Sequence, residues 1–264
     1  MLVWGGARPS GHMALDGAAY NPDDDSWRVI AKAPTTWLRA AAAAWDQLEE
    51  WPAQVWAGNV WVIGFKDLGD EQFDVGKFAM YDPELDEWRV LPESPVVRTL
   101  PMHLTWTGSR IVLTDSDRVS TLRLDADEWS AEPSPPGGLP AYGEPVWTES
   151  VLIAPINRFD PDAPWAFLAE WNERDGSWRE LVQPPSPSYG DLVTTRDFIF
   201  PTEGTVAYEV ATEHWWELSA PMSSSREEFA SLWTGQKLII WGGSAGGHIP
   251  DEVLQTGVVF TPDV

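Results

Sequence analysis

Residues 79–91 read Ala-Met-Tyr-Asp-Pro-Glu-Leu-Asp-Glu-Trp-Arg-Val-Leu. An apolar run, a turn rich in Asp and Pro, and a second run that opens on Trp88 are typical of a β-hairpin. The same piece recurs along the chain, and four further copies centre on Tyr20, Leu124, Trp171 and Tyr208. A shortened sixth copy spans residues 259–263. This repetition predicts one supersecondary unit that the chain uses many times.

A second repeated piece alternates with the first. It consists of an aromatic or β-branched pair, a tight turn that usually holds Gly, and another apolar run. The five copies lie at residues 55–63, 105–113, 146–153, 192–199 and 232–240. Each copy predicts a further β-hairpin. Two hairpins therefore make one four-stranded repeat.

The spacing of these repeats predicts the fold class. One repeat occupies about 44 residues, which is typical of a four-stranded propeller blade. The 264 residues then hold six such blades, with no helical periodicity between them. We predict a single all-β domain over residues 1–264, a six-bladed β-propeller. The blades are expected at approximately 1–30, 53–91, 103–131, 144–182, 190–218 and 229–264. The first begins in its second strand and the last ends after its third, so both are expected to be incomplete.

The two ends of the chain resemble Kelch repeats. Kelch repeats carry a double glycine after the second strand, an aromatic residue before the third-strand turn, and a Trp after that turn. Trp4-Gly5-Gly6 leads to Tyr20-Asn21-Pro22, and Trp241-Gly242-Gly243 leads to Phe260-Thr261-Pro262. The middle repeats depart from the pattern, because the second keeps only one of the two glycines. The resemblance implies a Kelch-type propeller similar to the central domain of galactose oxidase.

The resemblance also implies a range of functions. Some Kelch-like propellers are copper oxidases similar to galactose oxidase, and others are sialic acid mutarotases. The oxidase chemistry requires a Cys cross-linked to Tyr, and this sequence contains no Cys. A mutarotase-like activity needs only acid and base groups in a pocket. It therefore stays open as an alternative, although no motif identifies it.

The amino-acid composition limits the kinds of molecule that the protein is expected to bind. The sequence has 18 Trp and a formal net charge of -24. Binding of nucleic acid depends on Lys and Arg displacing counterions, so neither nucleic acid nor an anionic membrane is an expected partner. The charge also keeps copies apart, and we expect a monomer without metal or cofactor. No apolar run has the length of a signal peptide or membrane span. We expect a soluble protein, cytoplasmic as written, and extracellular or periplasmic if the N-terminus is truncated.

The long connecting loops of a propeller lie on one face and usually carry function. On that face the sequence places an unusual share of cations and imidazoles. The candidate ligand-binding residues are Arg8, His12, Lys66, Arg98, His103, Arg158, Arg226 and His248. His12 and His248 occupy equivalent loop positions and are candidates for a joint site, with solvated histidines of a shared ancestral loop as the alternative. Arg98 and Arg226 precede inner strands, where they either hold a carboxylate or bond neighbouring carbonyls.

These features favour a non-enzymatic binding module that recognises a protein or carbohydrate on the long-loop face. The alternative is a sugar-active isomerase, similar to a mutarotase, or a lyase, with a site at the central channel. Catalytic residues are not identified by the sequence.

Overall fold

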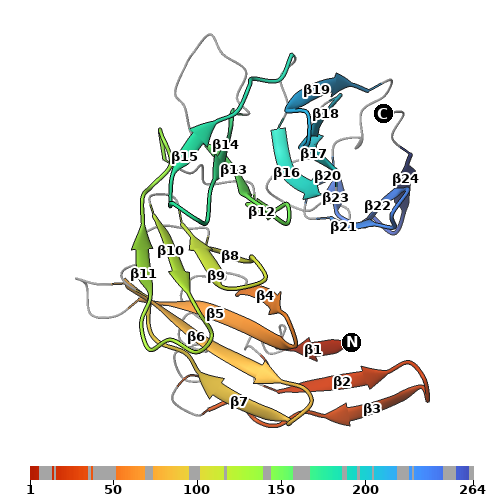
Figure 1. The fold of residues 1–264 in the computed structure, drawn as a ribbon. Coiled ribbons are helices and arrows are strands. Elements are labelled where there is room, and N and C mark those ends of the chain that lie inside the picture. The colour runs from red at the N-terminus through yellow and green to blue at the C-terminus, as the bar shows by residue number, and fades with distance from the viewer. Residues whose placement is uncertain are drawn as a thin grey trace. The chain divides into compact units, whose positions relative to one another are not determined.

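A computed structural model gives the architecture (Figure 1). It describes residues 1–5, 14, 16–34, 37, 52–68, 74–94, 102–115, 118–138, 144–156, 167–185, 189–194, 197–203, 205–218, 226–227, 229–245 and 254–261. The elements in these ranges are β-strands, arranged in small antiparallel sheets. The predicted all-β, six-bladed β-propeller is confirmed. Contacts divide the chain into two compact units, Met1–Glu132 and Pro133–Val264.

The first unit contains three sheets. The first sheet has three strands, and the other two have four each. In chain order the strands are β1 (Leu2–Trp4), β2 (Gly17–Asn21), β3 (Ser26–Val29); β4 (Ala53–Ala57), β5 (Val60–Leu68), β6 (Asp74–Asp82), β7 (Glu87–Val90); β8 (His103–Trp106), β9 (Ile111–Thr114), β10 (Val119–Leu122) and β11 (Ser130–Glu132).

The second unit also contains three blade sheets, two of four strands and one of three. They are built from β12 (Val146–Trp147), β13 (Leu152–Ile156), β14 (Phe167–Trp171), β15 (Trp178–Glu180); β16 (Tyr189–Thr194), β17 (Phe198–Glu203), β18 (Val206–Glu209), β19 (His214–Glu217); and β21 (Ala230–Trp233), β22 (Leu238–Trp241), β24 (Gly257–Phe260). A short extra pair joins β20 (Arg226–Glu227) to β23 (Ser244–Ala245).

The two three-stranded sheets are incomplete at opposite ends: the first sheet has no described inner strand, and the last has no described outer strand. In β1 and β2, Trp4 lies opposite Gly17, and in β22 and β24, Trp241 lies opposite Gly257. A Cβ on either glycine would come within 3 Å of the opposing indole, which explains the choice of Gly. β1 therefore corresponds to β22, the second strand of its blade. Among the described strands, the first blade has no inner strand and the last has no outer strand, as expected.

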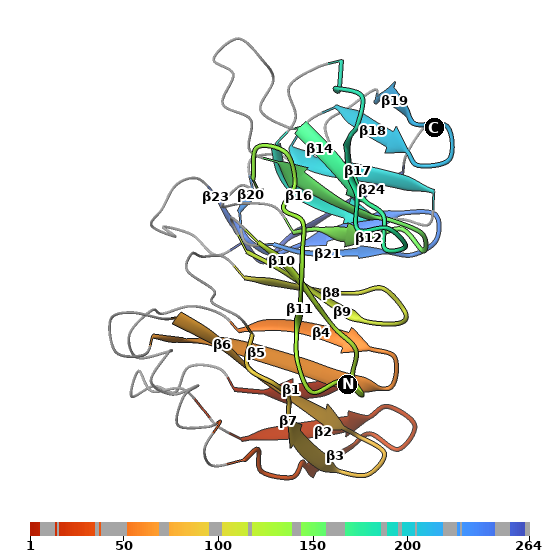
Figure 2. The same ribbon diagram turned by 60° about the vertical axis from the view of Figure 1, so that its left-hand side comes forward.

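Apolar side chains join successive sheets of the first unit. One cluster links β4–β7 to β8–β11 through buried residues such as Phe78 and Leu113. Another links the first sheet to the second through Ile30 and Ile63. Figure 2 shows β4–β7 lying between the other two sheets of this unit. The core of the unit is thus a series of thin layers between blades, because each sheet has little interior of its own.

One Trp at or just before the outer strand of each complete blade connects its blade to the preceding segment. Its indole N–H donates to a backbone carbonyl of the connection that leads into the blade. The pairs are Trp88 to Ala31 (2.8 Å), Trp129 to Pro92 (2.9 Å), Trp178 to Pro133 (2.7 Å) and Trp215 to Val182 (2.7 Å). A carbonyl in a connection has no ladder partner, so the indole satisfies it while filling the gap between layers.

An Arg next to this Trp makes a second connection at the rim. Arg89, on β7, donates to the carbonyl of Leu124 in the following blade of the same unit. Arg179, on β15, binds both carboxylate oxygens of Glu213 at 2.9 Å each. Successive residues of a strand point to opposite faces. The Trp can therefore contact the segment before its blade, while the Arg beside it contacts the blade that follows.

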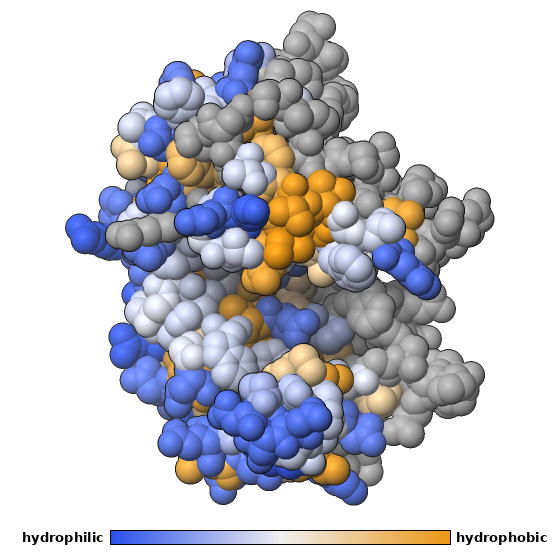
Figure 3. Space-filling view, turned by 90° about the vertical axis from the view of Figure 1, so that its right-hand side faces the viewer, coloured by the Kyte–Doolittle hydropathy of each residue, from blue (hydrophilic) through white to orange (hydrophobic). Residues whose placement is uncertain are grey.

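The last sheet presents apolar side chains. Leu232, Trp241 and Val259 are each more than half exposed, on β21, β22 and β24. Figure 3 shows apolar side chains gathered on the face where these strands lie. The exposure follows from the sequence of this sheet, where apolar residues occupy both faces of the strands.

We expect the inter-blade Trp to dominate stability. Trp129 is 7% exposed and packs on Phe78 with ring centroids 4.9 Å apart, whereas Trp27, its counterpart in the first blade, is 54% exposed. Trp129→Ala should lower the free energy of unfolding by about 3–5 kcal/mol. Trp27→Ala should change it by about 1 kcal/mol or less. Urea unfolding followed by circular dichroism measures both, and equal losses would contradict the assigned roles.

Candidate functional site

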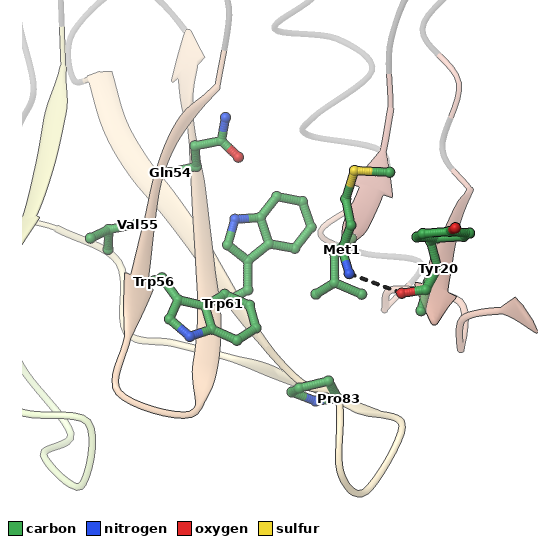
Figure 4. A pocket seen from close by; sticks show the side chains of 9 residues that line it. Met1, Tyr20, Gln54, Val55, Trp56, Trp61 and Pro83 are labelled. Atoms are coloured by element: carbon green, nitrogen blue, oxygen red, sulfur yellow. Dashed lines mark hydrogen bonds between the residues drawn. The ribbon is translucent and has the colours of Figure 1, made fainter. Parts of the chain in front are cut away.

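A pocket of about 640 Å³ opens between the first two sheets of the first unit (Figure 4). Its walls are mostly aromatic and apolar. The lining residues are Met1, Leu2, Ala19, Tyr20, Gln54, Val55, Trp56, Trp61 and Pro83. Several of them adjoin the tight turns after β4, β2 and β6, which lie on the short-turn face of the blades. The pocket is therefore on the opposite side from the long loops.

The hairpin of β4 and β5 supplies one wall. A two-residue turn at Gly58 and Asn59 brings Trp56 directly opposite Trp61 in the register. Gly58 has a φ of 68°, a left-handed conformation that glycine adopts without the Cβ penalty of other residues. Residues opposite each other in a sheet share a face, so the two indoles come from one side of the hairpin. Trp61 is 9% exposed and Trp56 is 49% exposed, which leaves Trp56 available to a ligand.

The first sheet supplies the facing wall. The amino group of Met1 donates to the carbonyl of Tyr20 at 2.9 Å, and the Tyr20 amide donates back to the Met1 carbonyl at 2.8 Å. The Tyr20 hydroxyl donates to Asp25 at 2.9 Å, and its ring packs on Trp27 at 5.1 Å. Leu2 and Ala19, the next paired residues, pack toward the second sheet, so the Tyr20 ring lies on the opposite face of the first sheet (Figure 4).

A charged cluster holds the third wall, the turn that carries Pro83. The Arg28 guanidinium, from the first sheet, donates to the Pro83 carbonyl at 3.0 Å and to Asp86 at 2.9 Å. Asp86 also accepts from the Tyr81 hydroxyl and, at 3.0 Å, from the Ala31 amide. These bonds hold the Pro83 turn of the second blade against the first sheet. Residues outside the pocket lining thereby fix the position of one pocket wall.

These contacts shift the ionisation of the cluster. The hydrogen bond from Tyr81, followed by that from the Ala31 amide, lowers the pKa of Asp86 to about 2. Burial, and then the bond to Asp86, raises the pKa of Tyr81. The hydrogen bonds to Tyr81 and Asp86 raise the pKa of Arg28. The carboxylate is thus held in its charged form, which is a structural role, because the group lies outside the pocket lining.

The side chains that line the pocket are suited to binding a ligand and not to catalysing a reaction. Among the described residues that line the pocket there is no carboxylate, imidazole, lysine or guanidinium. The Gln54 amide offers donors and an acceptor, and the aromatic rings offer flat apolar faces. Elsewhere in the described ranges, no three acidic or imidazole side chains come together as metal ligands would. Within the same ranges the protein has no helix that is long and apolar enough to cross a membrane.

None of the sequence-predicted site residues that the structure describes lines this pocket. Arg8, His12, Arg98, Arg158 and His248 fall outside the described residues. Lys66 lies on β5 and Arg226 on β20, where the structure describes the backbone. His103 begins β8 opposite Thr114, is partly buried, and lies at the long-loop end of its blade. The structure therefore does not test the predicted joint site, which stays a prediction.

Sequence reasoning missed the pocket because it assigned function to the long loops. One signal was present: an indole recurs at or near the end of the inner strand, at Trp56, Trp106, Trp147 and Trp233. Because the indole recurs in several blades, the pattern indicates a structural role and not a binding site. Of the four, Trp56 is the one whose side chain is classed as exposed, at 49%.

The Asp86 cluster predicts a specific dependence on pH. A carboxyl whose pKa is lower in the folded state contributes stability above its unfolded pKa of 3.8, and loses it as the pH falls toward about 2. Asp86→Asn should therefore lower the melting temperature at pH 6, and the difference from wild type should shrink between about pH 4 and pH 2. Tyr81→Phe, which keeps the ring and removes the donor, should show part of the same effect. A difference that is constant from pH 6 to pH 2 would contradict the assignment.

Comparison with known proteins bears on the family. No family model matches the chain. Over 92% of its length the chain is 23% identical to the Kelch-like protein terF of Aspergillus terreus, and it spans 58% of that protein's length. The solved structure of YjhT superposes with a TM-score of 0.57 and 14% identity, covering 97% of this chain and 94% of that one. The likeness to YjhT concerns the fold alone. With the repeats and the sheets already described, these findings show a six-bladed β-propeller whose sequence is similar to that of a Kelch-like protein.

Proposed function

We propose that the chain is a non-enzymatic binding module that takes a protein or carbohydrate ligand at the pocket beside Trp56. The observation that carries this proposal is the lining itself. The exposed Trp56 indole, Leu2 and Gln54 line one open space in the first unit. Aromatic side chains provide large contact area at low entropic cost, and they dominate binding surfaces for that reason. The Kelch-like relative supports an interaction module in general terms.

The same lining favours binding over proton-transfer catalysis. General acid-base catalysis needs a positioned titratable group within hydrogen-bond reach of the substrate. In the described lining the Tyr20 hydroxyl donates to Asp25, and the Met1 amino group donates to a backbone carbonyl. Both groups are thus used within the protein. A sugar-active isomerase at the central channel gains no support from this site.

The pocket and the long-loop face are separable by mutation. Trp56 lies at the turn end of β4, and His103 at the opposite, loop end of β8. Ligands are sought on a glycan array and in a peptide display library, with the folded wild-type protein. For a ligand so found, Trp56→Ala should weaken binding by about tenfold or more, measured by titration calorimetry.

Two variants serve as controls. Trp216→Ala removes an indole that is 43% exposed in the second unit, and it should leave the affinity unchanged. His103→Ala should also leave it unchanged. A loss of affinity in His103→Ala without a loss in Trp56→Ala would move the site to the long-loop face. The absence of any glycan or peptide ligand for a folded sample would count against the binding module.

A further inference from the structure

We propose that a crevice between the second and third blades binds a small polyhydroxylated ligand, of about the size of a monosaccharide, between Arg89 and Asp127. The crevice has a volume of about 360 Å³ and is lined by Arg89, Val90, Leu91, Pro92, Ala126 and Asp127. It shares no lining residue with the Trp56 pocket. The inference therefore goes beyond the proposed function, and neither depends on the other.

The junction of the first and second blades shows the same positions in a closed form. Arg28 donates through Nη2 to the Tyr81 hydroxyl at 3.3 Å and to the Pro83 carbonyl at 3.0 Å, and through Nη1 to Asp86 at 2.9 Å. The Tyr81 hydroxyl in turn donates to Asp86, and the Ala31 amide donates to the same carboxylate at 3.0 Å. One hydroxyl thus accepts from the guanidinium and donates to the carboxylate.

These positions recur at the junction of the second and third blades. Trp88 marks them in the second blade and Trp129 in the third, because each indole donates to the connection before its own blade. The turn that precedes each of these Trp residues has the same length. Aligned on them, the counterparts of Arg28, Ala31, Tyr81, Pro83 and Asp86 are Arg89, Pro92, Leu122, Leu124 and Asp127.

The groups that close the first junction are replaced at the second. Leu122 is buried and has no hydroxyl, and Pro92 has no amide N–H to donate. Arg89 donates through Nη2 to the Leu124 carbonyl, as Arg28 does to Pro83, but within the described residues its Nη1 makes no hydrogen bond. Asp127 likewise has no hydrogen bond or ion pair to another described residue. A cation and an anion therefore line one cavity without closing it.

The fifth blade, which keeps the tyrosine, also keeps the closed pair. Tyr208 takes the position of Tyr81 there, and Arg179 binds both carboxylate oxygens of Glu213 at 2.9 Å each. Glu213 has a left-handed φ of 57°, whereas Asp127 is not among the described non-glycine residues with positive φ. The turn of the third blade thus holds its carboxylate differently, and this difference accompanies the loss of the tyrosine.

The missing groups define the class of ligand. A ligand hydroxyl can accept from Arg89 and donate to Asp127, as the Tyr81 hydroxyl does between its own two partners. A neighbouring hydroxyl can supply the donor that Pro92 lacks. A lone anion would be repelled by Asp127, and a lone cation by Arg89, so an uncharged ligand is favoured. The aliphatic lining residues provide contact for the C–H groups of a polyol.

The probes are D-glucose, D-galactose and myo-inositol, each titrated into the full chain, with glycine as a zwitterion that carries no hydroxyl. Binding is followed by amide NMR spectra. We expect at least one polyol to give saturable shifts at the amides of Arg89, Val90 and Asp127. The Kd is expected in the millimolar range, because a small ligand makes few contacts. Glycine should give no such shifts.

A matched pair of charge variants locates the ligand. Asp127→Asn replaces a charged acceptor by a neutral one and should weaken polyol binding about tenfold. Glu128→Gln makes the same change of charge at the next residue, which is exposed and outside the crevice lining. It should leave the Kd unchanged. Equal losses in the two variants would show an effect of overall charge and would overturn the site.

A second pair of variants tests the missing hydroxyl. Leu122→Tyr supplies the hydroxyl from within the chain, and Leu122→Phe supplies the same ring without it. Leu122→Tyr should abolish polyol binding and should melt at a higher temperature than Leu122→Phe, which should still bind. Equal binding and equal melting temperatures would contradict the comparison with Tyr81. If neither variant folds, Asp127→Asn and Glu128→Gln still decide the question.

Three further results would overturn the inference. The absence of saturable shifts with all three polyols would remove the site. Binding of glycine without binding of any polyol would show that the ligand class is wrong. If polyol binding is lost in Trp56→Ala and retained in Asp127→Asn, the polyol occupies the Trp56 pocket, which supports the proposed function and not a second site. The opposite result supports the second site and leaves the proposed function to its own test.

Discussion

The hydrogen bond from an indole N–H to a carbonyl in the connection before its blade is the interaction on which the scaffold depends. Thin four-stranded sheets have no interior, and each must bury its faces against a neighbour. The connections between them contain prolines and cannot join a ladder, so their carbonyls need partners from elsewhere. Trp88 and Trp129 meet both needs in the first unit, and Trp178 and Trp215 do so in the second. Four of the 18 Trp residues serve this role.

Arginine adds a weaker and more selective connection at the rim. Arg28 and Arg179 directly follow a Trp in the sequence. Each binds an acidic residue in the turn between the last two strands of the following blade. Those acceptors, Asp86 and Glu213, both have left-handed φ angles near 57°. Such ion pairs are solvent-exposed, and exposed pairs contribute little to stability. Their effect is on geometry, because the Arg28 cluster fixes the turn that carries Pro83 and so shapes the pocket.

The candidate site lies where the repeat is interrupted. In a complete blade the second strand bonds an inner strand, but β1 has a described partner on one side alone. Open edges invite pairing with other chains, and proteins usually protect them with charge, proline or a covering segment. Here the edge borders an aromatic pocket and the protein as a whole is strongly acidic.

The sequence by itself determined the all-β class, the repeat, the six blades and the incomplete first and last sheets, since all of these follow from local pattern. The turn glycines, the Trp after each Asp-rich turn and the Trp-Gly-Gly ends are visible within one repeat. Only the tertiary structure decided which of the repeated Trp side chains are buried, which carbonyl each indole reaches, and that a pocket forms beside Trp56. Those features depend on residues such as Arg28 and Asp86, 58 positions apart in the chain. A local pattern carries no information about such pairs, because the register between neighbouring blades is set by packing.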